Sequence, residues 1–181
     1  MEDVPFDIPV TWKWVTLGSL GIFTRGSGIK RDETTEEGSP CVRYGQLYTT
    51  YHERFSDIQS KTSKSIYDKC HKIKKNDIVM ALTGENNFDI ALASVYTGDE
   101  IVAIGGDMTK YEPIIVNSMY LMYVINSAHG IAFKRNYAKG NIIVHISNDN
   151  LSLIPIPLPP IEEQQRIVDK LETILPLIEN I

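Results

Sequence analysis

Side chains able to bind nucleic acid gather between residues 24 and 75. This stretch holds 11 Lys or Arg and 7 Asp or Glu, an excess of four positive charges, although the whole chain carries a net charge of −5. Arg and Lys can bind guanine edges or phosphates, and Asn and Gln can bind adenine edges. The predicted nucleic-acid contacts are Arg25, Lys30, Arg31, Arg43, Gln46, Lys61, Lys64, Arg135, Asn136 and Lys139.

Two interpretations of this charge pattern stay open. The rest of the chain holds 7 Lys or Arg and 16 Asp or Glu, so a local phosphate-binding face and a separate surface for proteins would fit. The same excess of positive charge would also fit an ordinary solvated surface. Tyr44 and Tyr48, which lie among the basic residues, would suit either a contact role or the core.

The sequence contains none of the short motifs of common active sites. GxSxG and HExxH are absent, and the cysteines and histidines do not show metal-ligand spacing. Asp77 and Asp149 would suit a metal-dependent nuclease, but Asp also favours turns. Residues 86–89, Asn-Asn-Phe-Asp, are similar to the [ND]PP[YF] motif of amino-methyltransferases but lack both prolines. We therefore expect a binding module without catalysis, metal or cofactor, with a nuclease as the alternative.

The C-terminal stretch predicts a helix built to lie along another helix. The stretch that begins at Ile154 is expected to open extended, because proline fixes φ and restricts the residue before it, and Pro159 and Pro160 suit the first turn of a helix. A helix follows, with Glu162 and Glu163 at its positive end. Its apolar residues recur in alternating three- and four-residue steps, interrupted by Gln164, as in a coiled coil. The predicted helix-partner interface comprises Ile161, Val168, Leu171, Leu175 and Ile178.

Upstream of this helix, the patterns predict a strand-rich α+β fold with small helices. Strands are expected at 41–48, 78–82, 90–96, 101–104, 141–146 and 151–156, and 119–125 is expected to be a strand or a strand-to-helix segment. Helices are expected at 19–23, at 60–73 and over about ten residues that end near Asn136; residues 147–150 are expected to form a turn. Trp12 and Trp14 are expected to fill the core. The clearest boundary divides a domain at 1–157 from the start of a helix at 158–181.

The sequence also indicates the cellular compartment in which the protein is expected. No apolar run approaches the length of a membrane span, and the acidic N-terminal stretch is unlike a signal peptide. We therefore expect a cytoplasmic protein with no membrane contact, in which Cys41 and Cys70 are reduced. The helical pattern is unfinished at Ile181, so we expect a piece of a longer helix.

Several blocks, in order along the chain, resemble the specificity (S) subunits of type I restriction–modification systems. Residues 5–18, 40–47 and 73–84 are similar to successive blocks of that family, the last with Asn76 in place of the usual glycine. Residues 104–107, Ile-Gly-Gly-Asp, form a further block. The most specific block is IPIPLPPIEEQQRIVDKLE, which begins at Ile154 and resembles the junction between a recognition domain and a conserved helix.

This resemblance implies a target recognition domain that reads one half of a split DNA site. Its partners would be double-stranded DNA, the methyltransferase (M) subunits that dock on the helix and, through them, the restriction (R) subunit, with catalysis left to these partners. Family members carry two recognition domains, whereas one is present here. A piece of a full subunit would fit, and so would a half-sized subunit that self-associates through the C-terminal helix and reads a palindromic site. A protein-assembly module whose partners contact the DNA is the remaining alternative.

Overall fold

The computed structural model describes residues 5–86, 88–140 and 143–178. One five-stranded sheet contains, in spatial order, β2 (Gly21–Arg25), β12 (Met108–Pro113), β8 (Ile78–Ala81), β10 (Ala93–Tyr96) and β5 (Arg54–Phe55). A second contains β3 (Thr34–Thr35), β6 (Ser60–Thr62), β4 (Ser39–Val42), β11 (Val102–Ile104) and β7 (Lys72–Ile73). Two short antiparallel pairs join β1 (Lys13–Thr16) to β14 (Pro155–Leu158) and β9 (Thr83–Gly84) to β13 (Val144–His145).

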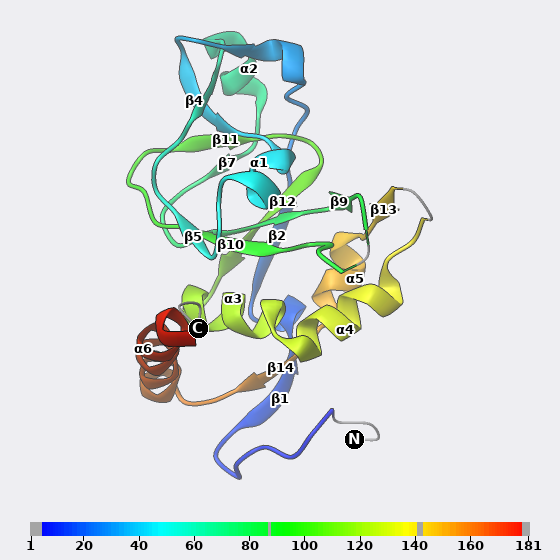
Figure 1. The fold of residues 1–181 in the computed structure, drawn as a ribbon, viewed down its shortest axis with the longest axis vertical. Helices are drawn as coiled ribbons and strands as arrows, with labels where there is room; N and C mark the ends of the chain where they lie inside the picture. The colour runs from blue at the N-terminus through cyan, green and yellow to red at the C-terminus, as the bar shows by residue number, and fades with distance from the viewer. Residues whose placement is uncertain (1–4, 87, 141–142, 179–181) are drawn as a thin grey trace.

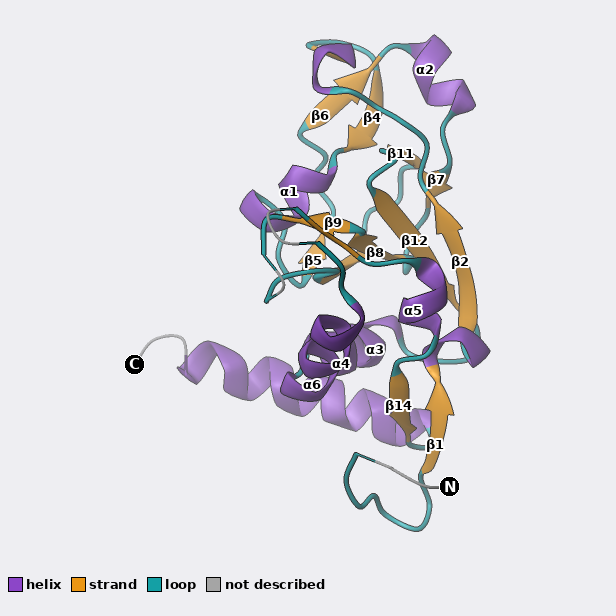
Figure 2. Cartoon of the chain, turned by 90° about the vertical axis from the view of Figure 1, so that its right-hand side faces the viewer, coloured by secondary structure: helices purple, strands orange, loops and turns teal. Residues whose placement is uncertain are grey.

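The helices lie at both ends of this arrangement, except that the helix containing Leu47 packs between the two five-stranded sheets. They are α1 (Tyr44–Thr49), α2 (Lys64–Lys69), α3 (Ser118–Asn126), α4 (Ala128–Tyr137), α5 (Asn148–Ser152) and α6 (Ile161–Ile178). In Figure 1, α2 lies with the second sheet at the top, and α3 to α6 lie below the first sheet. Figure 2 shows α6 across the base of the molecule, with its C-terminal half extending beyond α3 and α4. The arrangement confirms the predicted α+β class.

The first sheet is the central layer, because β8 faces a separate core on each side. All four residues of β8 are buried, as the sequence predicts. Ile78 and Met80 pack into the larger cluster, which includes residues of α3, whereas Val79 and Ala81 pack into a cluster shared with the second sheet. Successive side chains of a strand point to opposite faces, so the continuous apolar run serves both cores.

Two predicted elements near the N-terminus are wrong, the first because a strand distant in sequence pairs with it and the second because a local side-chain contact ends it. The segment predicted as a helix at 19–23 instead contributes to β2, which pairs antiparallel with β12 from Gly21 to Arg25. The predicted strand at 41–48 ends at Val42. There the backbone N–H of Arg43 donates to Oε1 of Gln46 (3.0 Å), a capping contact that starts α1.

Further along the chain, the expected helix at 60–73 is broken into β6, α2 and β7, since β6 pairs with β4 and β7 with β11. Residues 119–125 form part of α3. The expected turn at 147–150 is wrong, because Oγ of Ser147 accepts from the N–H of Asn150 (3.2 Å) and caps α5. The predicted strand at 141–146 appears as β13, with residues 141–142 outside the described part of the chain.

The two tryptophans are half-buried at the base of the molecule rather than deep in a core. The ring of Trp14 packs edge-on against Phe6, with centroids 4.9 Å apart. Nε1 of Trp12 donates to Oε2 of Glu163 in α6 (3.2 Å). The N-terminal segment is thereby tied to the start of α6. None of the described helices combines the length and the apolar character that a membrane span needs.

Candidate nucleic-acid interface

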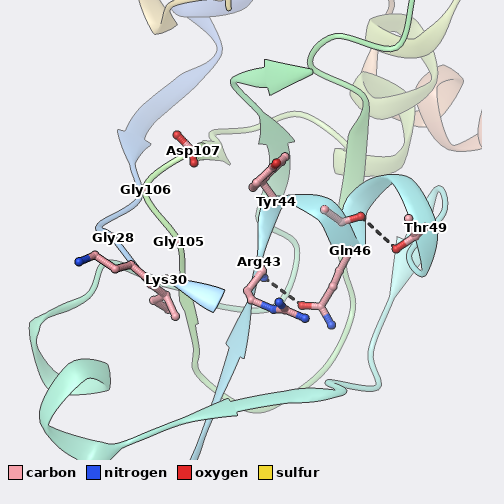
Figure 3. A pocket seen from close by; sticks show the side chains of 11 residues that line it. Gly28, Lys30, Arg43, Tyr44, Gln46, Thr49, Gly105, Gly106 and Asp107 are labelled. Atoms are coloured by element: carbon pink, nitrogen blue, oxygen red, sulfur yellow. Dashed lines mark hydrogen bonds between the residues drawn. The ribbon is translucent and has the colours of Figure 1, made fainter. Parts of the chain in front are cut away.

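A cavity of about 870 Å³ opens where the two five-stranded sheets meet (Figure 3). Three connections form its wall: the loop that follows β2, the junction from β4 into α1, and the turn between β11 and β12. Its lining residues are Gly28, Ile29, Lys30, Arg43, Tyr44, Gly45, Gln46, Thr49, Gly105, Gly106 and Asp107.

Backbone hydrogen bonds fix these three connections relative to one another. The N–H of Gly26 donates to the carbonyl of Met108 (2.8 Å) in the first sheet. The next residue, Ser27, donates to the carbonyl of Ile104 (3.2 Å) in the second sheet. Because β4 and β11 are parallel, they end at the same edge, where the N–H of Gly105 donates to the carbonyl of Val42 (3.2 Å). The cavity wall is therefore held by main-chain contacts from both sheets.

Arg43 and Gln46 supply polar groups that the protein does not fully use. Nε of Arg43 is buried and has no hydrogen-bond partner within the described residues. Gln46 is 8% exposed, and its Oε1 accepts from the Arg43 backbone. Buried donors are normally satisfied, so an unpaired guanidinium donor beside a cavity is suited to an external acceptor.

Three of the ten predicted contacts line this cavity: Lys30, Arg43 and Gln46. Arg25 lies beside it and donates through Nε to the carbonyl of Gly106 (3.1 Å), which positions the β11–β12 turn. The side chain of Arg31 lies outside the described part of the structure. The structure thus brings together contacts that lie up to 21 positions apart in the sequence.

The other predicted contacts lie elsewhere. Lys61 is exposed on β6, and Lys64 at the start of α2 pairs with Asp68 (3.1 Å). Arg135 and Asn136 are exposed near the end of α4, followed by the exposed Lys139. The guanidinium of Arg135 lies 4.1 Å from the centroid of the Phe88 ring, a cation–π contact.

Tyr44, for which the sequence left open a contact role or a place in the core, is exposed at the cavity. Thr49 and Asp107 are also exposed there but were not predicted, and Asp107 adds a carboxylate to the basic and amide groups. The signal in the sequence was the Gly-Gly-Asp turn, which the family resemblance also includes. Tyr48 has a different role: its hydroxyl donates to the carbonyl of Thr83 (3.1 Å) and ties α1 to β9. Burial raises the pKa of Tyr48 above its ordinary value of 10.0.

Two further kinds of titratable group are buried away from the cavity. Nζ of Lys134 donates to the carbonyl of Ala91 (2.9 Å), and burial lowers the pKa of Lys134 to about 8 although Asp89 opposes the shift. Cys41 and Cys70 are free and buried, and burial raises the pKa of Cys41 to about 11. Across the part of the chain that the structure describes, no three or more His, Cys, Asp or Glu residues form a group that could hold a metal ion.

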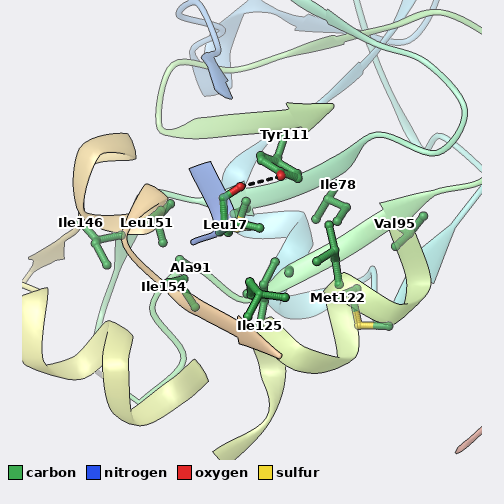
Figure 4. Packing of buried hydrophobic residues seen from close by; sticks show 14 of the residues in the cluster. Leu17, Ile78, Ala91, Val95, Tyr111, Met122, Ile125, Ile146, Leu151 and Ile154 are labelled. Atoms are coloured by element: carbon green, nitrogen blue, oxygen red, sulfur yellow. Dashed lines mark hydrogen bonds between the residues drawn. The ribbon is translucent and has the colours of Figure 1, made fainter. Parts of the chain in front are cut away.

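The start of α6 packs on the body of the protein. Val168 is 3% exposed and belongs to the larger core cluster, other members of which are drawn in Figure 4. Gln164 is 2% exposed; its Oε1 accepts from the N–H of Asn117 (2.9 Å) and its Nε2 donates to the carbonyl of Pro159 (3.0 Å). The series of residues 161, 164, 168, 171, 175 and 178, in three- and four-residue steps, forms the apolar stripe of α6. The body of this chain covers two of its positions, Gln164 and Val168.

Other members of the predicted helix-partner interface remain accessible. Ile161 and Ile178 are exposed, and Leu175 is half-buried. Leu171 lines an apolar cavity of about 240 Å³ together with Tyr123 of α3. Beyond the stripe, Ile174 and Leu177 also expose apolar surface near the end of α6. Apart from Ile161 at its start, the exposed apolar residues of α6 therefore lie near its C-terminal end.

The family model described as the type I restriction modification DNA specificity domain matches residues 9–181. The chain belongs to this family. Among curated members, the EcoAI specificity subunit of Escherichia coli is 24% identical over 179 residues, which cover 96% of this chain and 30% of the relative. The MjaVIII specificity subunit of Methanocaldococcus jannaschii is 26% identical over 164 residues, which cover 88% and 35%.

Solved structures of type I specificity subunits share the fold. The HsdS subunit from Thermoanaerobacter tengcongensis superposes with a TM-score of 0.72 at 19% identity, covering 99% of this chain and 41% of that one. The type I S subunit from M. genitalium superposes with a TM-score of 0.61 at 18% identity, covering 98% and 42%. The specificity-domain chain described here therefore spans between a third and a half of the length of these structures.

Proposed function

We propose that this chain is a target recognition module that binds double-stranded DNA and reads one half of a bipartite site. The observation that carries the proposal is the cavity where Arg43 and Gln46 lie together with Lys30, in a chain of the DNA specificity family. Main-chain contacts from two sheets hold the cavity wall, so side chains on it have fixed positions. Such fixed positions favour the reading of base edges.

The chemistry of the cavity suits bases as well as phosphates. A guanidinium such as that of Arg43 binds O6 and N7 of guanine, and an amide such as that of Gln46 binds N6 and N7 of adenine. Asp107 can accept from N4 of cytosine. A surface for phosphates alone would have no use for a carboxylate, so the mixture favours base contacts with Lys30 at the rim.

The remaining predicted contacts fit a supporting electrostatic role. Lys61 and Lys64 on the second sheet and α2, and Arg135, Asn136 and Lys139 beyond the first sheet, lie away from the cavity. Exposed cations bind phosphates without reading sequence, and each such contact makes affinity depend more steeply on salt. We assign them to the DNA backbone.

Single substitutions test the proposed division between side chains that read bases and side chains that contact the DNA backbone. The duplex that the unmodified chain enriches from a random-sequence pool serves as the selected probe, and its scrambled version as the nonspecific probe. Arg43→Ala should cost about 1–3 kcal/mol for the selected duplex alone. Lys64→Ala should weaken both duplexes alike and reduce the salt slope by about one. Lys170→Ala, an exposed cation on α6, is the control. The proposal fails if the unmodified chain enriches no sequence, or if Arg43→Ala retains full selectivity.

Docking of the M subunits belongs to the far part of α6. Ile178, which is 59% exposed, lies on the predicted stripe. We expect Ile178→Asp to prevent co-purification with the cognate M subunit and to leave DNA binding unchanged. The control Thr173→Asp, on the exposed polar face, should leave both co-purification and DNA binding unchanged. The module contributes recognition, and the partners contribute methylation and cleavage.

A protein-assembly module without base readout is the second candidate. The exposed apolar end of α6 and the acidic balance outside residues 24–75 favour it. In that case Ile178→Asp would abolish assembly, and Arg43→Ala would have no effect on binding to any duplex. The two variants together therefore separate the candidates.

A further inference from the structure

Gly28 and Gly45 are glycines that the fold itself does not require. Neither has a positive φ, so the backbone at both positions is open to other residues. A Cβ built on either glycine meets nothing within 4 Å. Both glycines line the same cavity. The space in front of them is therefore left empty by the rest of the protein.

Gly26, two residues earlier in the same loop, shows the contrast. A Cβ at Gly26 would lie 2.1 Å from the carbonyl oxygen of Gly105, so close approach of the chain to itself requires glycine there. Gly28 has no such neighbour. Gly45 lies inside α1, where glycine is less favourable than alanine by about 1 kcal/mol. No contact among the described residues requires glycine at position 45.

The groups beside the two glycines indicate what fills the space. Nε of Arg43 is buried without a partner among the described residues, and Oε1 of the neighbouring Gln46 accepts from the Arg43 backbone. Figure 3 shows the side chains of Arg43 and Gln46 next to each other among the lining residues. A partner must come close to reach them, and a side chain at position 28 or 45 would stand in its way.

We propose that Gly28 and Gly45 are clearance residues, which leave room for the edge of a base pair to reach Arg43 and Gln46. The inference rests on the proposed function and adds a role for residues that carry no functional group. The loop then contains glycine for two different reasons. Gly26 is needed because the chain packs closely against itself, and Gly28 leaves space for the bound DNA.

The test fills the space without disturbing the fold. Gly45→Leu and Gly28→Leu place a side chain in the cavity, and Ser65→Leu is the matched control, because Ser65 is exposed and holds in α2 the same second position that Gly45 holds in α1. Thermal melts should show each variant folded. We expect the Leu variants to bind the selected duplex at least about tenfold more weakly, with the scrambled duplex unaffected.

The outcomes distinguish the inference from the proposed function. Unchanged binding of the selected duplex by folded Leu variants overturns the clearance role and leaves DNA recognition intact. Equal weakening for both duplexes means that the cavity holds the DNA backbone, which overturns base-edge clearance. If both Leu variants fail to fold, the glycines serve packing and the inference is wrong. If the unmodified chain selects no sequence, the proposed function fails and the inference fails with it.

Discussion

Gln164 provides the sharpest test of how α6 is attached. In the coiled-coil interpretation, Gln164 is the polar interruption of an apolar stripe, so Gln164→Leu should strengthen helix packing. In the structure, Gln164 is 2% exposed and bonds two backbone groups, the N–H of Asn117 and the carbonyl of Pro159. Asn117 is the N-cap of α3. The side chain thus joins the start of α6 to the start of α3.

The expected magnitude follows from these two bonds. Leucine would leave both backbone groups buried without a partner, at about 1–3 kcal/mol each. Its added apolar burial returns about 1–2 kcal/mol. We therefore expect Gln164→Leu to lower the free energy of unfolding by about 2 kcal/mol, which corresponds to a fall in Tm of about 4–8 °C for a chain of this size.

Urea unfolding and thermal melts of the whole chain measure the effect. Gln165→Leu is the control, because Gln165 bonds the Nδ2 of Asn117 at the surface and its loss should cost less than about 1 kcal/mol. A Gln164→Leu protein as stable as the unmodified chain, or more stable, would refute the account of α6 as fixed by this side chain and restore the simple coiled-coil interpretation.

Two further predictions concern charged groups. Between its folded pKa of about 8 and its ordinary value of 10.5, Lys134 binds more protons in the unfolded state, so its contribution to stability rises with pH. The difference in unfolding free energy between the unmodified chain and Lys134→Met should therefore grow by about 2 kcal/mol from about pH 7 to about pH 9.5; a flat difference would contradict the burial of the charge. The ion pair between Arg54 of β5 and Glu172 of α6 is partly exposed, so a double-mutant cycle should give a coupling below about 1 kcal/mol.

The sequence predicts secondary structure best where a short local pattern is compatible with only one kind of element. The apolar run 78–82 predicts a buried strand, which β8 confirms. The proline-rich segment followed by acidic residues predicts an extended stretch and then a helix, which β14 and α6 confirm. Both signals are contained within a few residues. No distant partner is needed to interpret them.

Prediction fails where a distant partner decides. The helix expected at 60–73 is broken because β6 pairs with β4 and β7 pairs with β11. The strand expected at 41–48 ends for a local reason, because Gln46 caps the backbone of Arg43. The cavity depends on the parallel pairing of β4 with β11, about 60 residues apart, which brings Gly105 to Gly28 and Arg43. Residue types suggested Arg43 and Gln46, but the empty space in front of the glycines exists only in three dimensions.

The stripe on α6 shows a related limit. Three- and four-residue spacing predicts that one helix face is covered, without stating by what. In this chain the body covers Gln164 and Val168, and the exposed apolar residues other than Ile161 lie towards the end of the helix. A coiled-coil pattern and an intramolecular packing pattern are identical over these first two turns. Only the contact with α3 separates them.

Side-chain contacts attach α6 to the body of the protein at more than one place along the helix. Trp12 bonds Glu163 and Asn117 bonds Gln164, while Arg54 of the first sheet pairs with Glu172 further along the helix. At 1.5 Å per residue, these contacts are spread over about 13 Å of the helix. Because the helix is held at separate points along its length, it cannot rotate about one of them. The same sheet contributes β2 and β12 to the cavity wall. The direction of α6 is therefore fixed relative to the cavity. Under the proposed function, the length of the helix beyond Glu172 would set the distance to a second half-site, and the cavity residues would set which bases are read.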